Sequence, residues 1–304
     1  VILYVLIRMM PVSYLVDNFR AANSQNPDQE QVEAQLYEML TVYGLEDNSF
    51  GGILRGYFIW LGKFITGDMG YSFKYLGQVE EVIGMYMWTS FGISFAALIF
   101  EMIIAIPLGI KCAVNQYGKL DYVATVLCMV GIAFPSFFLG EIVIELFGVK
   151  LGWFPIVGMG DGGLDTLWHM ILPMFVLVVL NIGGLMRYTR TNTLEVLNAD
   201  YVRTARAKGL SEGKVIYKHV FRNTMIPLVT QLSFTLPTLF GGAMITEEIF
   251  SLPGIGQIAY HGMVEGDIFL AMGYNMFLAV LTVIGVLFAD IMYAVVDPRV
   301  KLGS

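Results

Sequence analysis

The sequence predicts an all-α protein, a polytopic bundle of six transmembrane helices. The first observation is composition: of 304 residues, 56% are hydrophobic and 14% are charged, whereas an ordinary soluble domain has about 25% charged residues. The second is that the apolar residues are gathered into runs long enough to cross a hydrocarbon layer, which takes roughly 20 residues as a helix. The third is that basic residues alternate between successive connections, as a membrane topology requires.

Five apolar runs have the length of a spanning helix. They cover residues 88–113, 122–147, 167–186, 225–245 and 268–296. A sixth run, residues 1–15, is too short to span and contains Arg8. We interpret residues 1–16 as the remainder of a first spanning helix cut short in this chain. A signal peptide is disfavoured, because a basic leader and a small-residue cleavage site are missing.

The distribution of Lys and Arg predicts that both ends face the cytoplasm. The connection 187–224 is the densest basic stretch, and Lys111, Lys119, Arg299 and Lys301 mark two further connections or ends. By contrast, the connection between the second and third full runs contains one such residue, Lys150. The connection between the fourth and fifth runs contains no Lys or Arg. Because basic connections stay in the cytoplasm, this alternation fixes the orientation of every span.

An acidic outer segment, residues 17–87, is expected outside the cell. Asn26-Pro27-Asp28 and Gly44 carry start and stop signals for a helix of about four turns. A second stretch, 53–65, mixes Trp60 and other aromatic residues with basic ones. It suits an amphipathic helix, lying either at the membrane interface or against neighbouring loops.

The basic connection 187–224 predicts a protruding helical hairpin, because Gly209 can end one helix and Ser211 can cap the next. Residues 201–210 read Tyr-Val-Arg-Thr-Ala-Arg-Ala-Lys-Gly-Leu, followed by His219, Arg222, Asn223 and Pro227. This string resembles the cytoplasmic coupling loop in permease subunits of binding-protein-dependent ATP-binding-cassette importers. It is most similar to their peptide and nickel branch.

Further stretches agree with that branch. They include Gly-Asp-Met-Gly-Tyr-Ser at 67–72, Pro-Ser-Phe-Phe-Leu-Gly at 135–140, the stretch 148–155, Glu247 with Phe-Ser-Leu-Pro-Gly-Ile-Gly at 250–256, and Asp-Pro-Arg at 297–299. The long outer segment resembles the first, or B-type, permease of a two-permease oligopeptide or dipeptide importer. The chain departs from the family where Met-Trp-Thr-Ser at 87–90 replaces Pro-x-Thr-Leu.

The resemblance implies a type I importer permease fold, with a core permease domain at 88–304, and it implies partners. These are a second permease, two ATP-binding subunits, which would bind ATP and Mg, an extracytoplasmic solute-binding protein, a peptide substrate and the lipid bilayer. The residues it places at the ATPase are Arg203, Thr204, Ala205, Arg206, Ala207, Lys208 and Gly209. The residues it places toward the binding protein are Asp68, Gly70, Pro253 and Gly254. Nickel chelate is the alternative substrate.

Acidic residues inside apolar runs are costly and therefore become functional hypotheses. Glu101, Glu141 and Glu247 are candidates to line the translocation pathway and attract a peptide amino terminus. Alternatively they pair with polar groups of the second permease, and Glu145 is expected near the outer interface. Pro107, Pro135, Pro173 and Pro237 are expected to kink or loosen their helices.

No catalytic chemistry is encoded in the chain. Gly213-Lys214 is followed by Val215 and lacks the phosphate-loop frame. The three His residues are scattered, and Cys112 and Cys128 lie in or beside apolar runs, so no cofactor or metal site is expected and nucleic acid is not a partner. The rival hypothesis is a proton-coupled secondary transporter with Glu101, Glu141 and Glu145 as a relay, but the inverted repeats it requires are not found.

Overall fold

The computed structural model describes residues 4–5, 16–17, 19–21, 23–24, 28–45, 47 and 49–296. Most of the expected first span, residues 1–16, lies outside the described residues. Over the described ranges the chain is helical, apart from turns and a two-stranded antiparallel hairpin of β1 (Tyr71–Ser72) and β2 (Gly77–Gln78).

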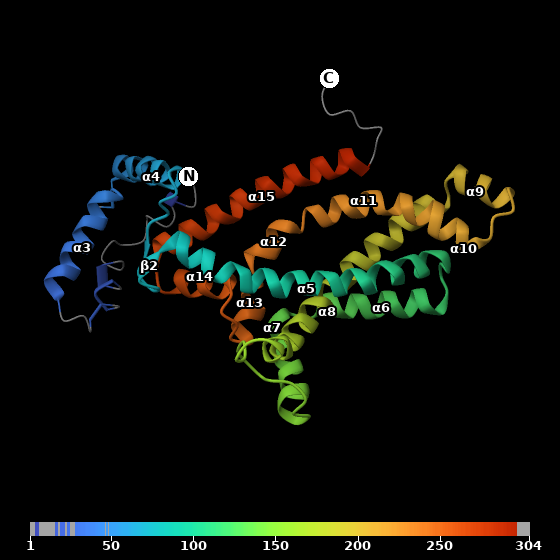
Figure 1. Ribbon diagram of the computed structural model, residues 1–304, viewed down its shortest axis with the longest axis horizontal. Coiled ribbons are helices and arrows are strands. Elements are labelled where there is room, and N and C mark those ends of the chain that lie inside the picture. The colour runs from blue at the N-terminus through green and yellow to red at the C-terminus, as the bar shows by residue number, and fades with distance from the viewer. Residues whose placement is uncertain are drawn as a thin grey trace, which may run out of the picture.

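Long helices run side by side along one axis (Figure 1). Four stretches of the described chain are long and apolar enough to cross a membrane: α5 (Val79–Val114), α8 (Leu164–Leu197), the stretch Pro227–Ile249, and Ile268–Ala294 within α15 (Ile268–Val296). A bent pair is a fifth candidate. The outer segment lies at one end of the bundle and the basic hairpin at the other, as the alternation of charges predicts.

The second predicted run is broken rather than continuous. It forms α6 (Lys119–Ala133), then α7 (Ser136–Val143), which continues into the π-helix η1 (Ile144–Lys150). The chain bends by 102° between α6 and α7. Pro135 sits at the break, where its ring disfavours helical geometry for Phe134 before it. In Figure 1 the α7–η1 arm therefore points away from the bundle. Pro107 and Pro173, by contrast, lie within uninterrupted helices.

The fourth predicted run is also interrupted. It forms α11 (Phe221–Ser233), α12 (Leu236–Gly241) and α13 (Met244–Ile249), and α14 (Ile255–Val264) follows. Gly242 separates α12 from α13 with a φ of 77°, a conformation that glycine adopts without steric cost. Apolar composition alone predicts one helix here, but a glycine at positive φ ends it.

Three helices pack closely enough to form one body. A side-chain carbon on Gly109 of α5 would lie 2.7 Å from the carbonyl oxygen of Met186 on α8. One on Gly183 of α8 would lie 2.8 Å from the carbonyl oxygen of Cys128 on α6. Toward the hairpin end, Arg190 donates two hydrogen bonds, at 2.6 and 2.8 Å, to the carboxylate of Asp121, and so joins α8 to α6.

The first helix of the outer segment, α3 (Gln29–Val42), confirms the helix expected before Gly44. Asp28 caps it, since its carboxylate accepts a hydrogen bond from the amide of Gln31 at 3.1 Å. Asn26 and Pro27, the start signals named from the sequence, lie outside the described residues. Gly44 has the expected positive φ of 63°.

The second, α4 (Phe50–Ile65), covers the predicted amphipathic stretch. The hydroxyl oxygen of Ser49 caps it by accepting a hydrogen bond from the amide of Gly52 at 3.1 Å. Ile53 and Trp60 are buried in the core that the outer segment shares with α14 and α15, whereas Phe58 is exposed. This helix therefore packs on its neighbours along one face and leaves an aromatic side chain outside.

Two carboxylates fasten the outer segment. Asp68 accepts hydrogen bonds from the Tyr43 hydroxyl (2.7 Å), the Lys63 ammonium (2.9 Å) and the Gly70 amide (3.0 Å). Asp267 accepts one from the Ser72 hydroxyl at 2.6 Å and another from the amide of Leu270 in the first turn of α15. The β-hairpin is thereby joined to the start of the last span.

We predict that Arg190→Met destabilises the protein by about 3–5 kcal/mol, because it leaves the buried carboxylate of Asp121 without its cation. Equilibrium unfolding in mixed micelles measures this. Glu33→Gln is the control, since it breaks the exposed ion pair with Arg20. It should change the unfolding free energy too little to measure. Equal effects of the two variants would contradict the prediction.

Stability should also depend on pH through Asp68. Burial acts to raise the pKa of this carboxyl, but the hydrogen bonds from Tyr43 and Lys63 outweigh burial and hold the pKa below its ordinary value, which is about 3.9. Because the folded-state pKa is the lower one, the contribution is complete above the ordinary pKa and is lost as pH falls through the folded-state value. The melting temperatures of the parent and of Asp68→Asn should therefore differ by a constant amount from pH 7 down to about 4 and converge below it, and a difference that stays constant below pH 4 would refute this.

Candidate functional site

A cavity of about 510 Å³ lies inside the bundle, between α5, α8 and the α11–α12 stretch. Its lining residues are Ser94, Ala97, Leu98 and Glu101 from α5; Leu177, Asn181, Gly184, Leu185 and Tyr188 from α8; and Gln231, Leu232, Thr235, Thr238, Leu239, Gly242 and Ala243. Three stretches far apart in the sequence thus line one partly open space within the apolar part of the chain, at which Asn181, Gln231 and Thr238 are exposed.

Glu101 is the one charged residue among those that line this cavity in the described chain. It is accompanied by the side-chain amides of Asn181 and Gln231 and by the hydroxyls of Thr235 and Thr238. The amide of Asn181 donates to the carbonyl oxygen of Leu177 at 2.9 Å, so its oxygen remains available as an acceptor. Such a lining can bind a cationic group at the carboxylate and hydrogen-bond amide groups along the wall.

Glu101 was named from the sequence, but its polar neighbours were missed. The signal that marks them is the same one that marked Glu101: Asn181 and Gln231 are polar residues inside the apolar runs 167–186 and 225–245. Their convergence depends on how α8 packs against α11, which hydropathy does not report.

Glu141, a candidate for the pathway, does not line this cavity. Glu141 is exposed on the α7–η1 arm, outside the residues that line the cavity. Glu145, on the same arm, lies 3.3 Å from the ammonium of Lys150. The break at Pro135 is the physical reason, because it turns this arm out of the bundle.

Glu247 is likewise not a lining residue. Its side chain is only 2% exposed, and its carboxylate accepts hydrogen bonds from the Ser90 hydroxyl and from the backbone amides of Ala243 and Gln257. The structure therefore places it behind the wall formed by Gly242 and Ala243, holding that wall in place.

The basic hairpin has the predicted two-armed form. It consists of α9 (Asp200–Ala207) and, after a turn, α10 (Glu212–Lys214) and the π-helix η2 (Val215–Val220). Gly209 has a φ of 76°, which confirms the left-handed cap. Ser211 stands at the N-cap of the second arm, as expected, but its side chain makes no capping hydrogen bond.

The hairpin has a small core of its own. Ala205 is 6% exposed and packs with Val202, Val215 and Val220. The side chain of Ala205 therefore lies between the two arms of the hairpin, and its role at the ATPase stays a prediction. The other residues named there, Arg203, Thr204, Arg206, Ala207, Lys208 and Gly209, are exposed.

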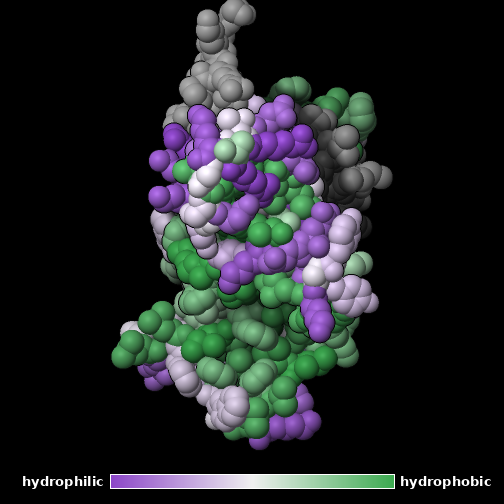
Figure 2. Space-filling view, turned by 90° about the vertical axis from the view of Figure 1, so that its right-hand side faces the viewer, coloured by the Kyte–Doolittle hydropathy of each residue, from purple (hydrophilic) through white to green (hydrophobic). Residues whose placement is uncertain are grey.

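The exposed basic residues of the hairpin differ in how closely they pair with acidic residues of the same chain. Arg206 donates two hydrogen bonds to the carboxylate of Glu212, at 2.8 and 3.3 Å, and so clamps the arms together. Arg203 lies 3.9 Å from the fully exposed Asp200, a loose contact. Figure 2, which looks onto this end, shows hydrophilic residues gathered over the hairpin and hydrophobic residues over the arm that projects below.

Of the residues named toward a binding protein, two have no free surface. Gly70 is buried, and a side-chain carbon there would lie 2.6 Å from the ring of Phe269. Gly254 is buried against Glu247. Pro253 is exposed and Asp68 is partly exposed, so these two remain candidates for such a contact.

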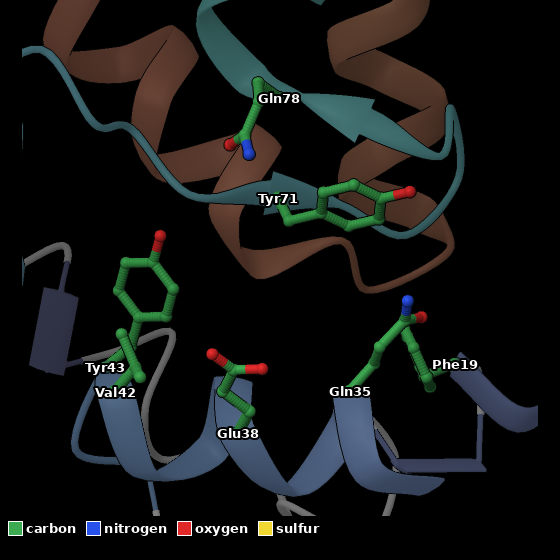
Figure 3. A pocket seen from close by; sticks show the side chains of 7 residues that line it. All are labelled: Phe19, Gln35, Glu38, Val42, Tyr43, Tyr71 and Gln78. Carbon is green, nitrogen blue, oxygen red and sulfur yellow. The ribbon is translucent and has the colours of Figure 1, made fainter. Parts of the chain in front are cut away.

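The outer segment also contains a groove of about 290 Å³ between α3 and the β-hairpin. Figure 3 shows Gln35 and Glu38 pointing from α3 toward the strands that carry Tyr71 and Gln78. Tyr43, whose hydroxyl bonds Asp68, closes one side. This groove is separate from the cavity of the bundle, with which it shares no lining residue.

Comparison with known proteins agrees with this architecture. Residues 105–302 match the family described as binding-protein-dependent transport system inner membrane component. The chain is 38% identical over 275 residues to the oligopeptide transport system permease protein AppB of Bacillus subtilis, covering 88% of this chain and 86% of that protein. It is 32% identical to OppB of Haemophilus influenzae, with 82% and 81% covered, and 32% identical to the dipeptide permease DppB of Alkalihalophilus pseudofirmus, with 81% and 80% covered.

Solved structures agree at the level of the fold. Two crystal forms of the MetNI methionine ABC transporter, described as inward facing, match with TM-scores of 0.58 and 0.59 at 18% and 19% identity. Each match covers 71% of this chain and 96% of the other. The resemblance noted from the hairpin motif and the predicted type I importer permease fold are confirmed. The chain belongs to the family of inner membrane components of binding-protein-dependent transport systems, as a membrane-spanning permease subunit of an ATP-binding-cassette importer.

Proposed function

We propose that this chain forms, with a second permease, the pathway by which an importer takes up oligopeptides or dipeptides. The observation that carries the proposal is the cavity of the bundle, where one carboxylate stands among amides and hydroxyls. A peptide offers a cationic amino terminus for Glu101 and backbone amide groups for Asn181 and Gln231. The relatives named as oligopeptide and dipeptide permeases support the same substrate class.

Helix α8 provides the connection between the cavity and the source of energy. It lines the cavity through Asn181 and Tyr188 and continues without a break to Leu197, where the hairpin begins. The tight contacts at Gly109 and Gly183 mean that α5 and α6 must move with it. A push on the hairpin is therefore delivered to the cavity wall.

The proposal includes partners that the hairpin and the family imply. Two ATP-binding subunits hydrolyse ATP with Mg, and this chain carries no catalytic step. An extracytoplasmic solute-binding protein delivers peptide to the end of the bundle where Asp68 and Pro253 have free surface. The location proposed is the bacterial or archaeal cytoplasmic membrane, crossed several times by this chain.

Reconstituted transport tests this function. Proteoliposomes that contain this permease, its second permease and the two ATPases should accumulate a labelled tripeptide when ATP and the binding protein are supplied. Accumulation should persist when the proton gradient is collapsed. Uptake that needs a proton gradient and no ATPase would instead support the secondary transporter.

We predict that Glu101→Gln lowers peptide uptake at least about tenfold, because it removes the charge that attracts the amino terminus. Uptake of a tripeptide with an acetylated amino terminus should change far less, since that substrate brings no cation. Glu141→Gln is the matched control, as Glu141 is exposed outside the cavity. Equal losses of uptake for both substrates would show that Glu101 does not bind the amino terminus.

The hairpin bases should separate into two classes. Arg203→Gln with Lys208→Gln should weaken docking of the ATPases, measured by co-purification and by peptide-stimulated ATP hydrolysis, while leaving the permease as stable as the parent. Arg206→Gln should weaken docking less, because this guanidinium is already paired with Glu212, and it should change the melting temperature little, because the pair is exposed. An Arg203–Lys208 double variant that retains full coupling would contradict the assignment.

A further inference from the structure

The outer end of the cavity is bounded by the break between α12 and α13. Gly242 and Ala243 at this break line the cavity, as does Ser94 on α5. Ser90 lies one turn from Ser94 toward the outer end of α5, just beyond the residues that line the cavity. It meets the carboxylate of Glu247, the first acidic residue of α13.

This carboxylate gathers three donors from separate elements. Its Oε1 atom accepts from the Ser90 hydroxyl at 2.6 Å and from the Ala243 amide at 3.0 Å, and its Oε2 atom accepts from the Gln257 amide at 2.9 Å. Ser90 in turn accepts a hydrogen bond from the amide of Ile255 at 2.8 Å. One buried group thus joins α5, the α12–α13 break and the start of α14.

Three glycines lie close to the carboxylate of Glu247. A side-chain carbon on Gly242 would lie 2.8 Å from Oε1, and one on Gly256 would lie 2.9 Å from Oε2. At Gly254 such a carbon would meet the carboxyl carbon itself. Gly254 therefore admits the carboxylate, while Gly242 and Gly256 also allow the backbone of the α12–α13 break to approach the start of α14.

The inner end of the cavity is joined by a different kind of contact. There the Tyr188 hydroxyl lies 3.4 Å from the carbonyl oxygen of Pro227. This long, exposed hydrogen bond joins α8 to α11, which also pack through buried apolar residues that include Met186 and Leu228. Charge-assisted hydrogen bonds are shorter and stronger than neutral ones, so the two ends of the cavity differ in what must be broken to open them.

We propose that Glu247 is the positioning residue that keeps the outer end of the cavity shut, and that its bonds to Ser90 and to the start of α14 must break each time the cavity opens outward. The inference rests on the proposed role of the cavity as the pathway. It differs from the sequence-based hypothesis for Glu247, because the carboxylate holds a wall and does not touch the substrate.

Side-specific labelling tests this. A reporter cysteine, Thr238→Cys, is placed in the cavity wall of the complete transporter, and right-side-out vesicles are treated with a membrane-impermeant maleimide. Cys112 and Cys128 are the chain's two native cysteines, and both are buried. Adding Glu247→Gln should raise the labelling rate from outside at least about tenfold, because one side-chain oxygen becomes an NH₂ group that cannot accept from its donors.

Two further variants reach the same contact from other sides. Ser90→Ala removes the hydroxyl, and Gly254→Ala pushes the carboxylate away. Both should raise the labelling rate from outside. If the Glu247→Gln protein does not accumulate in the membrane, these two variants test the proposal. Glu81→Gln, at an exposed carboxylate of α5, should leave outside labelling unchanged.

Unchanged outside labelling in all three variants would overturn the proposal. So would an equal increase in inside-out vesicles, which would show general loosening in place of a one-sided closure. Tripeptide uptake by the Thr238→Cys parent is measured in parallel. If that parent takes up no peptide while labelling still rises from outside, the proposed substrate fails and the closure at Glu247 does not.

Discussion

The structure depends on the contact between α5 and α8. The two helices approach so closely at Gly109 that a side-chain carbon there would meet the backbone of Met186. Lipid tails are as apolar as leucine, so helices in a bilayer associate through close packing and not through exclusion of water. Because α8 also carries both the cavity wall and the hairpin, this contact determines where the cavity lies and what moves with the hairpin.

The two ends of the bundle are held by different chemistry. At the outer end, buried carboxylates organise the backbone: Asp267 joins the β-hairpin to α15, and Glu247 joins α5 to α13 and α14. At the inner end, cations do the joining, since Arg190 reaches Asp121 and Arg206 reaches Glu212. The elements at the outer end are thus joined by bonds that buried acids accept, while the inner end has exposed bases on its surface.

Interruptions in the helices have a definite use here. Pro135 turns the α7–η1 arm out of the bundle, and Gly242 provides the break on which Glu247 acts. Irregular backbone at membrane depth is tolerated where it is buried in protein or lines a cavity. The Gly242–Ala243 break meets both conditions, because it lines the cavity on one side and donates to Glu247 on the other.

Much of the protein follows from the sequence alone. Apolar runs of spanning length, the alternation of Lys and Arg, and the glycine at position 209 determined the fold class, the orientation and the hairpin, because each is a local property of the chain. The surroundings of several candidate site residues did not follow from the sequence. Glu141 lies on an arm that leaves the bundle, Ala205 points into the hairpin's own core, and Gly70 and Gly254 are covered by side chains distant in sequence.

Only the tertiary structure decided which polar residues meet. Hydropathy identifies that a residue lies within a span, but not toward which neighbour its side chain turns. The grouping of Glu101 with Asn181 and Gln231, and of Glu247 with Ser90 and Gln257, depends on contacts between segments separated by many residues. Those contacts arise from helix packing, which no pattern within a single segment of the sequence specifies.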